Sequence, residues 1–215
     1  MAISKRKVQA LYQSGAKYYD FTTILYRLIG LRMKTYRSLA IKRLSLQQGD
    51  CVLELGCGTG LNFPFLIEQI GPEGRLIGVD LTSGMLAIAR ERVERSSWKN
   101  VKLIHSDIAA YDFPEGVNGV LATGVFGYIA EYDHVIKAAS NALVPGGHLV
   151  ILDGKQPENL PSCLFKIVLW LGRPFGFTPD YFKVHPWESV ERYLQETSLE
   201  QKYGGLIYIL SGTAP

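Results

Sequence analysis

A run of alternating glycines constrains the fold of this chain more than any other feature. It lies in VLELGCGTGLNFPFL (residues 52–66), where Gly56, Gly58 and Gly60 follow an apolar, β-favouring segment. A helical pattern, LNFPFLIEQI, comes directly after the glycines. Glycines between a strand and a helix let the backbone turn tightly and approach a ligand without a Cβ in the way. The stretch therefore predicts a strand, a ligand-binding loop and a helix, as found in open α/β sheets.

Strand-like and helix-like segments alternate from residue 50 onward. Helical patterns at 61–70, 83–96 and 131–143 separate short apolar runs rich in β-branched residues. Strands that alternate with helices indicate βαβ units, so we expect an α/β fold with a Rossmann-like, doubly wound, mostly parallel sheet. VPGG (144–147) is expected to be a turn. The expected strands are CVLELG (51–56), RLIGVDL (75–81), VKLIHSD (101–107), GVLATG (119–124) and HLVILDG (148–154).

The length of the chain limits the number of domains. At 215 residues it suits one α/β domain and leaves little room for a second hydrophobic core. We expect a single domain (1–215) in three parts. These are a basic helical cap at 1–45, a ligand-binding core at 46–154, and a lid with the last strands at 155–215.

Positive charge is concentrated at the N-terminus. Residues 1–45 hold ten Lys or Arg and one acidic residue, Asp20, and the remainder of the chain is net negative. Such asymmetry is found where an arm meets an anionic surface, and also where a helix presents a solvated charged face. Clustered Lys and Arg can also bind RNA phosphates. The charge pattern alone leaves these three explanations open.

The expected compartment is the cytoplasm. The N-terminus, MAISKRKVQALYQ, has no apolar core of signal-peptide length, and no uncharged apolar run reaches the roughly 18 residues of a membrane span. Cys51, Cys57 and Cys163 have neither metal-ligand spacing nor an obvious pairing, so we expect reduced packing residues and no metal site.

Acidic residues at three strand ends describe the ligand. The glycine spacing is G-x-G-x-G, whereas a dinucleotide fingerprint is G-x-G-x-x-G. Glu54, just before the loop, would suit a positive charge better than a pyrophosphate. Asp80 ends the second strand, where an acidic side chain binds ribose hydroxyls, and Asp107 with Ile108 could contact an adenine. A ligand with adenine, ribose and a cationic end, such as S-adenosylmethionine, fits this pattern.

Each of these residues also has a simpler explanation. The glycines can form only a turn, Asp80 can cap the next helix, and Asp107 can be an ordinary loop acid. Their coincidence after three successive strands favours a ligand site over three unrelated structural roles.

Four motifs in register resemble those of the class I S-adenosylmethionine-dependent methyltransferases: VLELGCGTG, GVDLTSGML, HSDIAAYDFP and ALVPGGHLVILD. The resemblance covers roughly residues 48–154. It implies S-adenosyl-L-methionine as cofactor and a C-terminal antiparallel hairpin, which residues 200–212 could supply. The implied cofactor-binding residues are Glu54, Gly56, Cys57, Gly58, Gly60, Asp80, Leu81, Met85, Asp107, Ile108, Thr123 and Gly124.

Methyl transfer places few demands on side-chain chemistry. A sulfonium already makes the transfer favourable, so the main task is to align the nucleophile and exclude water. A base is needed only where the nucleophile must lose a proton. We therefore assign no catalytic residue; among the histidines, only His185 lies in a segment expected to cover the substrate.

Two segments outside the core suggest the acceptor. AKYYDFTTILYRLIG (16–30) resembles the N-terminal region of quinone and phospholipid methyltransferases, where a tyrosine closes over the cofactor. Tyr18 or Tyr19 would do so here, and Tyr19 is assigned to the cofactor site. GTGLNFPFL is nearer the bacterial phosphatidylethanolamine methyltransferases. Residues 160–185 would form a lid for a lipophilic acceptor, with aromatic side chains from Phe165, Trp170, Phe175, Phe177, Tyr181 and Phe182.

The sequence thus predicts a methyltransferase that acts on a small, lipophilic lipid, quinone or phenolic metabolite. The alternative is an S-adenosylmethionine-binding regulatory or accessory protein without transferase activity. ATGVFGYIA lacks the Asn/Asp-Pro-Pro-Tyr pattern of enzymes that methylate base amines, so we expect no nucleic-acid partner. Arg27, Arg32 and Arg37 could contact an anionic membrane, which would place the protein peripherally at the inner membrane surface. Ordinary packing of the cap is the alternative.

Overall fold

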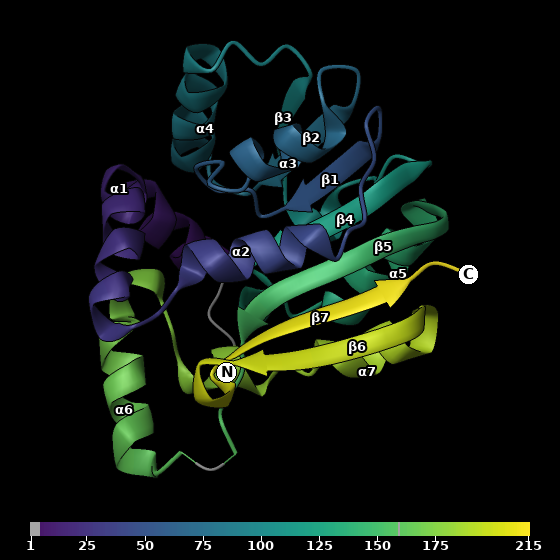
Figure 1. Cartoon of the computed structure of the whole chain (residues 1–215). Coiled ribbons are helices and arrows are strands. Elements are labelled where there is room, and N and C mark those ends of the chain that lie inside the picture. The colour runs from purple at the N-terminus through teal and green to yellow at the C-terminus, as the bar shows by residue number, and fades with distance from the viewer. Residues whose placement is uncertain (1–4, 159) are drawn as a thin grey trace.

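A seven-stranded sheet in the order β3-β2-β1-β4-β5-β7-β6 forms the centre of the protein (Figure 1). The structure is a computed structural model that describes residues 5–158 and 160–215, without the side chains of residues 17 and 22–25. Strands β1 to β5 are parallel, whereas β7 is antiparallel to β5 and to β6. The expected Rossmann-like sheet with a C-terminal antiparallel hairpin is confirmed. The strands are β1 (Cys51–Leu55), β2 (Arg75–Asp80), β3 (Val101–His105), β4 (Val117–Thr123), β5 (Leu143–Gly154), β6 (Gln195–Lys202) and β7 (Ile207–Thr213).

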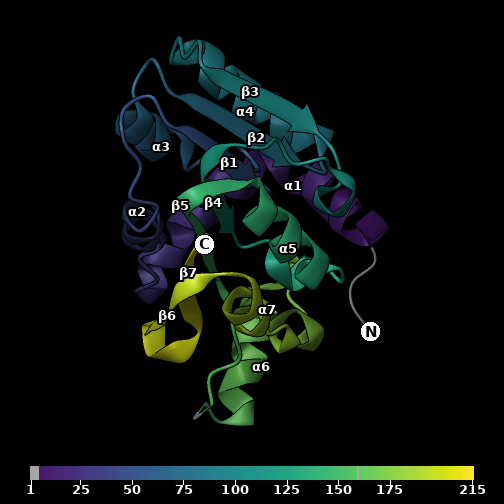
Figure 2. The same cartoon turned by 90° about the vertical axis from the view of Figure 1, so that its right-hand side faces the viewer.

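Helices cover both faces of the sheet (Figure 2). Because successive strand residues point to opposite faces, Leu149 and Ile151 of β5 pack with α5 and α7, whereas Val150 and Leu152 pack with α2, α3 and α4. This double burial explains why the central strands are continuously apolar. The α-helices are α1 (Lys5–Leu25), α2 (Met33–Lys42), α3 (Phe63–Ile70), α4 (Ser83–Arg95), α5 (Tyr132–Ala142), α6 (Ser162–Leu171) and α7 (Pro186–Tyr193). Short 3₁₀ segments include η1 (Tyr26–Ile29), η3 (Phe126–Tyr128), η4 (Arg173–Phe175), η5 (Pro179–Lys183) and η6 (Tyr203–Gly205).

The prediction of a turn at VPGG (144–147) is wrong, because strand β5 begins before it. The N–H of Gly146 donates to the carbonyl of Ala214, and the N–H of Ala214 donates to the carbonyl of Gly147. The segment thus pairs with the C-terminal end of the chain, and an irregularity in register with β4 absorbs the extra residues. Proline and glycine here mark a bulge in an extended strand.

Helix α1 is fastened to the glycine loop and to α4. The carboxylate of Asp20 accepts a hydrogen bond from Thr59 Oγ1 at 2.6 Å and pairs with Arg92 Nη2 at 2.6 Å. Arg92 Nε in turn donates to the carbonyl of Thr59 at 2.9 Å. The N-terminal cap is therefore held at the carboxyl edge of the sheet by the same residues that fix the loop.

We expect Gly60→Ala to destabilise the protein more than Gly116→Ala. Both glycines have a left-handed backbone, with φ of 76° and 75°, so alanine costs roughly 1 kcal/mol of strain at either position. At Gly60 an added Cβ would also lie 2.6 Å from the buried Phe63 ring, whereas at Gly116 it meets nothing within 4 Å. Overpacking should raise the loss at Gly60 to about 3 kcal/mol. Urea unfolding measures both variants, and equal losses would contradict the argument.

Candidate functional site

A cavity of about 100 Å³ lies where the carboxyl ends of β1, β2, β3 and β4 meet helix α1. Most residues expected to hold a cofactor line it, although they come from separate strand ends. This is the crevice in which open α/β sheets bind their ligands. The expected residues that line it are Tyr19, Gly56, Gly58, Asp80, Leu81, Met85, Asp107, Ile108, Thr123 and Gly124.

Asp80 shapes the floor of this cavity. Its Oδ2 accepts from the N–H of Gly58 at 2.8 Å, and its Oδ1 accepts from the N–H of Thr82 at 2.8 Å. Burial raises the pKa of Asp80, and the two backbone donors oppose that rise. One carboxylate thus fixes both the glycine loop and the start of α4, and each oxygen keeps acceptor capacity for a ligand hydroxyl.

Glu54 contributes a buried acceptor without a partner. Its Oε1 accepts from Asn62 Nδ2 at 2.6 Å, whereas its Oε2 is buried and has no hydrogen bond. Burial raises the pKa of Glu54 to about 8. The side chain borders a small space, about 20 Å³, beside Gly56, Cys57 and Gly58. An unsatisfied carboxylate oxygen at such a site suits a ligand that brings a positive charge and N–H donors.

Arg37 and Asn62 belong to this end of the site, although sequence analysis did not place them there. Asn62 Nδ2 also donates to Thr123 Oγ1 at 3.0 Å, and Arg37 Nη1 donates to Asn62 Oδ1 at 3.0 Å. The expectation that Arg37 faces a membrane is therefore corrected, because its guanidinium points toward the space beside Glu54. A guanidinium beside a buried carboxyl group, which an incoming positive charge would favour in its ionised form, can receive an amino-acid-like group. The charged residues of α2 are all basic, and Arg37 is not distinguished among them in the sequence, so nothing there signalled this inward role.

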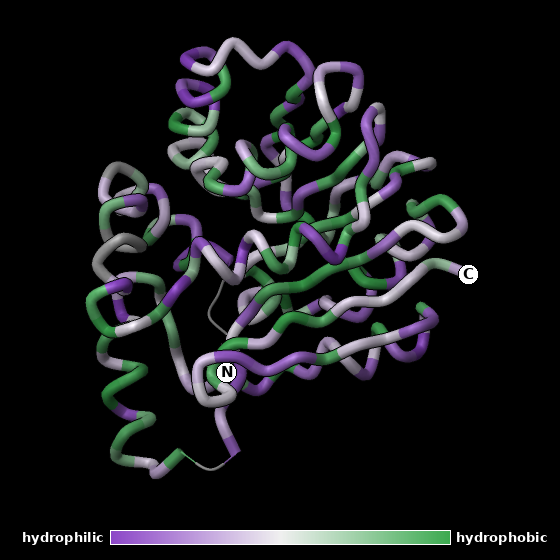
Figure 3. The backbone as a smooth tube through the Cα atoms, in the orientation of Figure 1, coloured by the Kyte–Doolittle hydropathy of each residue, from purple (hydrophilic) through white to green (hydrophobic). Residues whose placement is uncertain are grey.

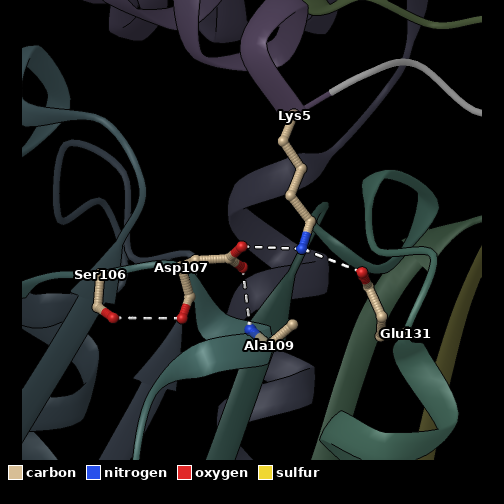
Figure 4. Close-up of polar contacts among 5 residues, drawn as sticks. All are labelled: Lys5, Ser106, Asp107, Ala109 and Glu131. Atoms are coloured by element: carbon tan, nitrogen blue, oxygen red, sulfur yellow. Dashed lines mark hydrogen bonds and ion pairs between the residues drawn. The ribbon is translucent and has the colours of Figure 1, made fainter.

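The residue expected at the adenine, Asp107, is paired with helix α1 (Figure 4). Its Oδ1 accepts from the N–H of Ala109 at 3.0 Å, and its Oδ2 lies 2.8 Å from Lys5 Nζ. Lys5 also reaches Glu131 Oε1 at 3.2 Å. These bridges are partly exposed, so each contributes little to stability. Lys5 therefore lies across the polar opening of the cavity, held there by weak salt bridges that a ligand could displace.

The structure decides between the two tyrosines of the YYD motif. The side chain of Tyr18 is 70% exposed, whereas Tyr19 lines the cavity. Tyr12 lies seven residues, or nearly two helical turns, before Tyr19 and therefore on the same side of the helix. Its hydroxyl lies 3.0 Å from that of Tyr128. Helix α1 thus supplies an aromatic wall.

A second cavity of about 260 Å³ adjoins the first. Tyr12, Tyr19, Thr123 and Gly124 line both. The rest of its wall is mainly aromatic and aliphatic. It comes from η1, α6 and the segment that follows α6, and also from the start of α2, the end of β5 and the segment around η6. Of the expected lid aromatics, Phe175, Phe177, Tyr181 and Phe182 line it. Phe165 packs on Phe182, and Trp170 is 62% exposed instead.

Asp153, at the end of β5, is the one carboxylate among the described residues that line the second cavity. It accepts hydrogen bonds from the Tyr181 hydroxyl and from the N–H groups of Gly154 and Phe126. Burial raises its pKa, against the effect of the Tyr181 bond. Asp153 therefore positions the aromatic wall. Sequence analysis missed it, although an acid that ends an apolar strand at the carboxyl edge is a usable signal.

Three expected residues lie elsewhere or act indirectly. Cys57 is buried against Gly78, and burial raises its thiol pKa, as for a packing residue. Gly60 lines neither cavity and is required by its contact with Phe63. His185 is half exposed, stacks on a tryptophan and lines neither cavity. The structure thus does not bring His185 to the site.

Comparisons with known proteins agree with this geometry. A family model described as "Methyltransferase domain" matches residues 52–147. A demethylmenaquinone methyltransferase of Shouchella clausii is 32% identical over 161 residues, 73% of this chain and 67% of that protein. The counterpart from Listeria welshimeri is 34% identical over 129 residues, 59% of this chain and 54% of that protein. The match to the Listeria relatives therefore spans about half of their length.

Solved structures show the same fold at low identity. A SAM-dependent methyltransferase from Aquifex aeolicus aligns with a TM-score of 0.58 at 18% identity, over 83% of this chain and 89% of that one. Geranyl diphosphate C-methyltransferase from Streptomyces coelicolor aligns with a TM-score of 0.66 at 14% identity, over 85% and 79%.

We expect Glu54→Gln to flatten the pH dependence of stability. With a folded pKa of about 8 against an ordinary 4.5, Glu54 keeps a proton on folding. Its contribution to stability is present below pH 4.5 and is lost as pH rises through 8, a change on the order of 3 kcal/mol between pH 5 and 8. Urea unfolding at several pH values measures the difference from wild type. The exposed Glu68→Gln is the control, and a variant slope equal to the wild-type slope would refute the assignment.

Proposed function

Because the chain belongs to the class I S-adenosylmethionine-dependent methyltransferases, in the branch that includes the demethylmenaquinone methyltransferases, we propose that it methylates a small lipophilic acceptor of quinone or phenolic type. The observation that carries the proposal is the pair of adjoining cavities. One is lined by glycines and acids at strand ends, the other by aromatic and aliphatic side chains. A shared wall lets a donor and an apolar acceptor meet.

The first cavity and the adjoining small space beside Glu54 together carry acidic and basic groups that could hold S-adenosyl-L-methionine. Asp80 would accept from the ribose hydroxyls, and Asp107 with Ile108 would contact the adenine. The orphaned Oε2 of Glu54 would accept from the ammonium group, and Arg37 would pair with the carboxylate. The remaining expected residues would contribute the backbone and the apolar sides of the pocket. These assignments are supported by the fit of charge and hydrogen-bonding capacity.

The chain has little to do beyond alignment. When bound, S-adenosylmethionine supplies a methyl group already activated by a sulfonium. Thr123 and Gly124 form the common wall, and the absence of a side chain at Gly124 leaves room there for two reactants to approach. The aromatic second cavity excludes water. Asp153 holds the Tyr181 side chain and the backbone at Phe126 in place. We assign no proton transfer to Asp153.

The three parts of the chain would act as one unit in the cytoplasm. Cap (1–45), core (46–154) and lid with last strands (155–215) all line the two cavities, although residues 1–4 and 159 lie outside the described residues. We further propose peripheral contact of the basic cap with an anionic membrane. Arg27 and Arg32 are exposed, as this requires.

Asp80→Ala should weaken S-adenosylmethionine binding at least tenfold, because it removes the ribose acceptor and releases the glycine loop. Isothermal calorimetry with S-adenosylmethionine, its demethylated product and NAD measures the effect and tests cofactor choice. Asp112→Ala is the matched control, and circular dichroism checks that both variants fold. Unchanged affinity in Asp80→Ala would refute the ribose role.

An acceptor screen tests the activity itself. Cofactor carrying a radiolabelled methyl group is incubated with hydroquinones, phospholipids and phenolic metabolites, and we expect label in an apolar hydroquinone or phenol. Labelling of phospholipid alone would contradict the acceptor class. Cofactor binding without any transfer would instead support a regulatory protein.

A further inference from the structure

Two neighbouring segments expose large apolar side chains to solvent. Leu28 of η1 is 82% exposed and Trp170 of α6 is 62% exposed. Exposed apolar residues are common singly, but a cluster on adjoining elements marks an interaction site. We call this cluster the apolar patch; it comprises Tyr18, Phe21, Leu28, Ile29, Leu164, Ile167 and Trp170.

The two halves of the apolar patch belong to one edge of the molecule. The Tyr26 hydroxyl of η1 donates to the carbonyl of Leu171 at the end of α6, at 3.1 Å. The Tyr26 ring also lies 5.1 Å from that of Phe175, just beyond α6. In Figure 1 the end of α1 and helix α6 lie at the left edge, and Figure 3 shows hydrophobic residues gathered along both.

The charge in the two segments that expose most of the apolar patch is positive, and Asp20, next to Phe21, is paired with Arg92. Residues 21–49 hold six Lys or Arg, residues 160–179 hold two, and neither segment contains Asp or Glu. Elsewhere the chain holds more acidic than basic residues, so the positive charge is local. Several of these cations are exposed, and we call them the basic rim: Arg27, Arg32, Lys34, Lys166 and Arg173.

The apolar patch continues into the second cavity. Ile29 belongs to both, and its neighbours in the cavity wall are Tyr26, Val168 and Leu171. The side of the cavity next to the patch is therefore formed by the same two elements that expose it. An apolar molecule that reached this edge would meet no charged carboxylate from either segment.

We propose that the apolar patch and its basic rim dock on the surface of an anionic lipid bilayer. Tryptophan, tyrosine and leucine on one face, with Lys and Arg around them, are the composition of elements that lie in the membrane interface. Each basic residue near an anionic surface adds to the attraction. Among the described residues no helix has the length and apolarity to cross a bilayer. In this orientation the acceptor would enter the second cavity directly from the lipid. Only this last point rests on the proposed function; the docking itself does not.

Vesicle co-sedimentation without cofactor or acceptor tests the docking surface. We expect binding to phosphatidylglycerol–phosphatidylcholine vesicles, weak binding to phosphatidylcholine alone, and loss of affinity as salt rises. The double variant Ile167→Ser, Trp170→Ser should bind at least tenfold more weakly. Leu199→Ser, an exposed leucine on β6, is its control.

Two double variants that each remove two positive charges distinguish an effect of the basic rim from an effect of net charge. Arg27→Gln with Arg32→Gln should weaken binding to the anionic vesicles about tenfold, whereas Arg95→Gln with Lys99→Gln, exposed on and after α4, should not. Tryptophan emission should shift to the blue on vesicle addition, and Trp170→Phe should abolish most of that shift.

The outcomes distinguish this proposal from the proposed function. Methyl transfer to a dispersed acceptor with no vesicle binding would overturn docking alone, and vesicle binding without transfer would overturn the activity alone. Equal binding by the patch variant and wild type would also overturn docking. Concentration-dependent dimers that bind no vesicle, and that the patch variant does not form, would show that a second copy covers the patch instead.

Discussion

The carboxylate of Asp80, buried beneath the glycine loop, is the contact on which the site depends. A buried carboxylate is unfavourable unless donors surround it, and Asp80 obtains them from the backbone of Gly58 and Thr82. The loop can supply such a donor because its glycines let the backbone fold over the strand end. From the opposite side, Asp20 of α1 binds Thr59 in the same loop. One acid from the sheet and one from the cap therefore fix the loop between them.

This double attachment explains how an open sheet edge becomes an enclosed chamber. The core alone would offer a shallow crevice at the strand ends. Helix α1 adds Tyr12 and Tyr19, which form the wall common to both cavities. Asp153 makes the corresponding attachment on the lid side, since it binds Tyr181 and the backbone at Phe126. Cap and lid are thus each held by one carboxylate: Asp20 of α1 on the cap side and Asp153 at the end of β5 on the lid side.

The sequence predicts those parts of the structure that depend on local pattern. Short apolar runs rich in β-branched residues locate the central strands, and the acids Asp80 and Asp107 follow directly from the strand ends. Arg37, Asn62 and Asp153 could not be placed in this way, because their roles arise where segments distant in sequence approach each other. Arg37 meets Asn62 only once α2 packs beside α3. The prediction of a turn at VPGG (144–147) was wrong for a related reason, because this segment pairs with residues at the far end of the chain.

Helix α1 joins two surfaces of opposite polarity. Its first residue described, Lys5, bridges Asp107 and Glu131 at the mouth of the first cavity, whereas Tyr18 and Phe21 near its other end belong to the apolar patch. A polar, charged cofactor would bind favourably at the first of these surfaces and gain nothing at the second, and an apolar acceptor the reverse. Two reactants that differ so strongly in hydration could then reach a common wall from opposite sides, without either having to cross the path of the other.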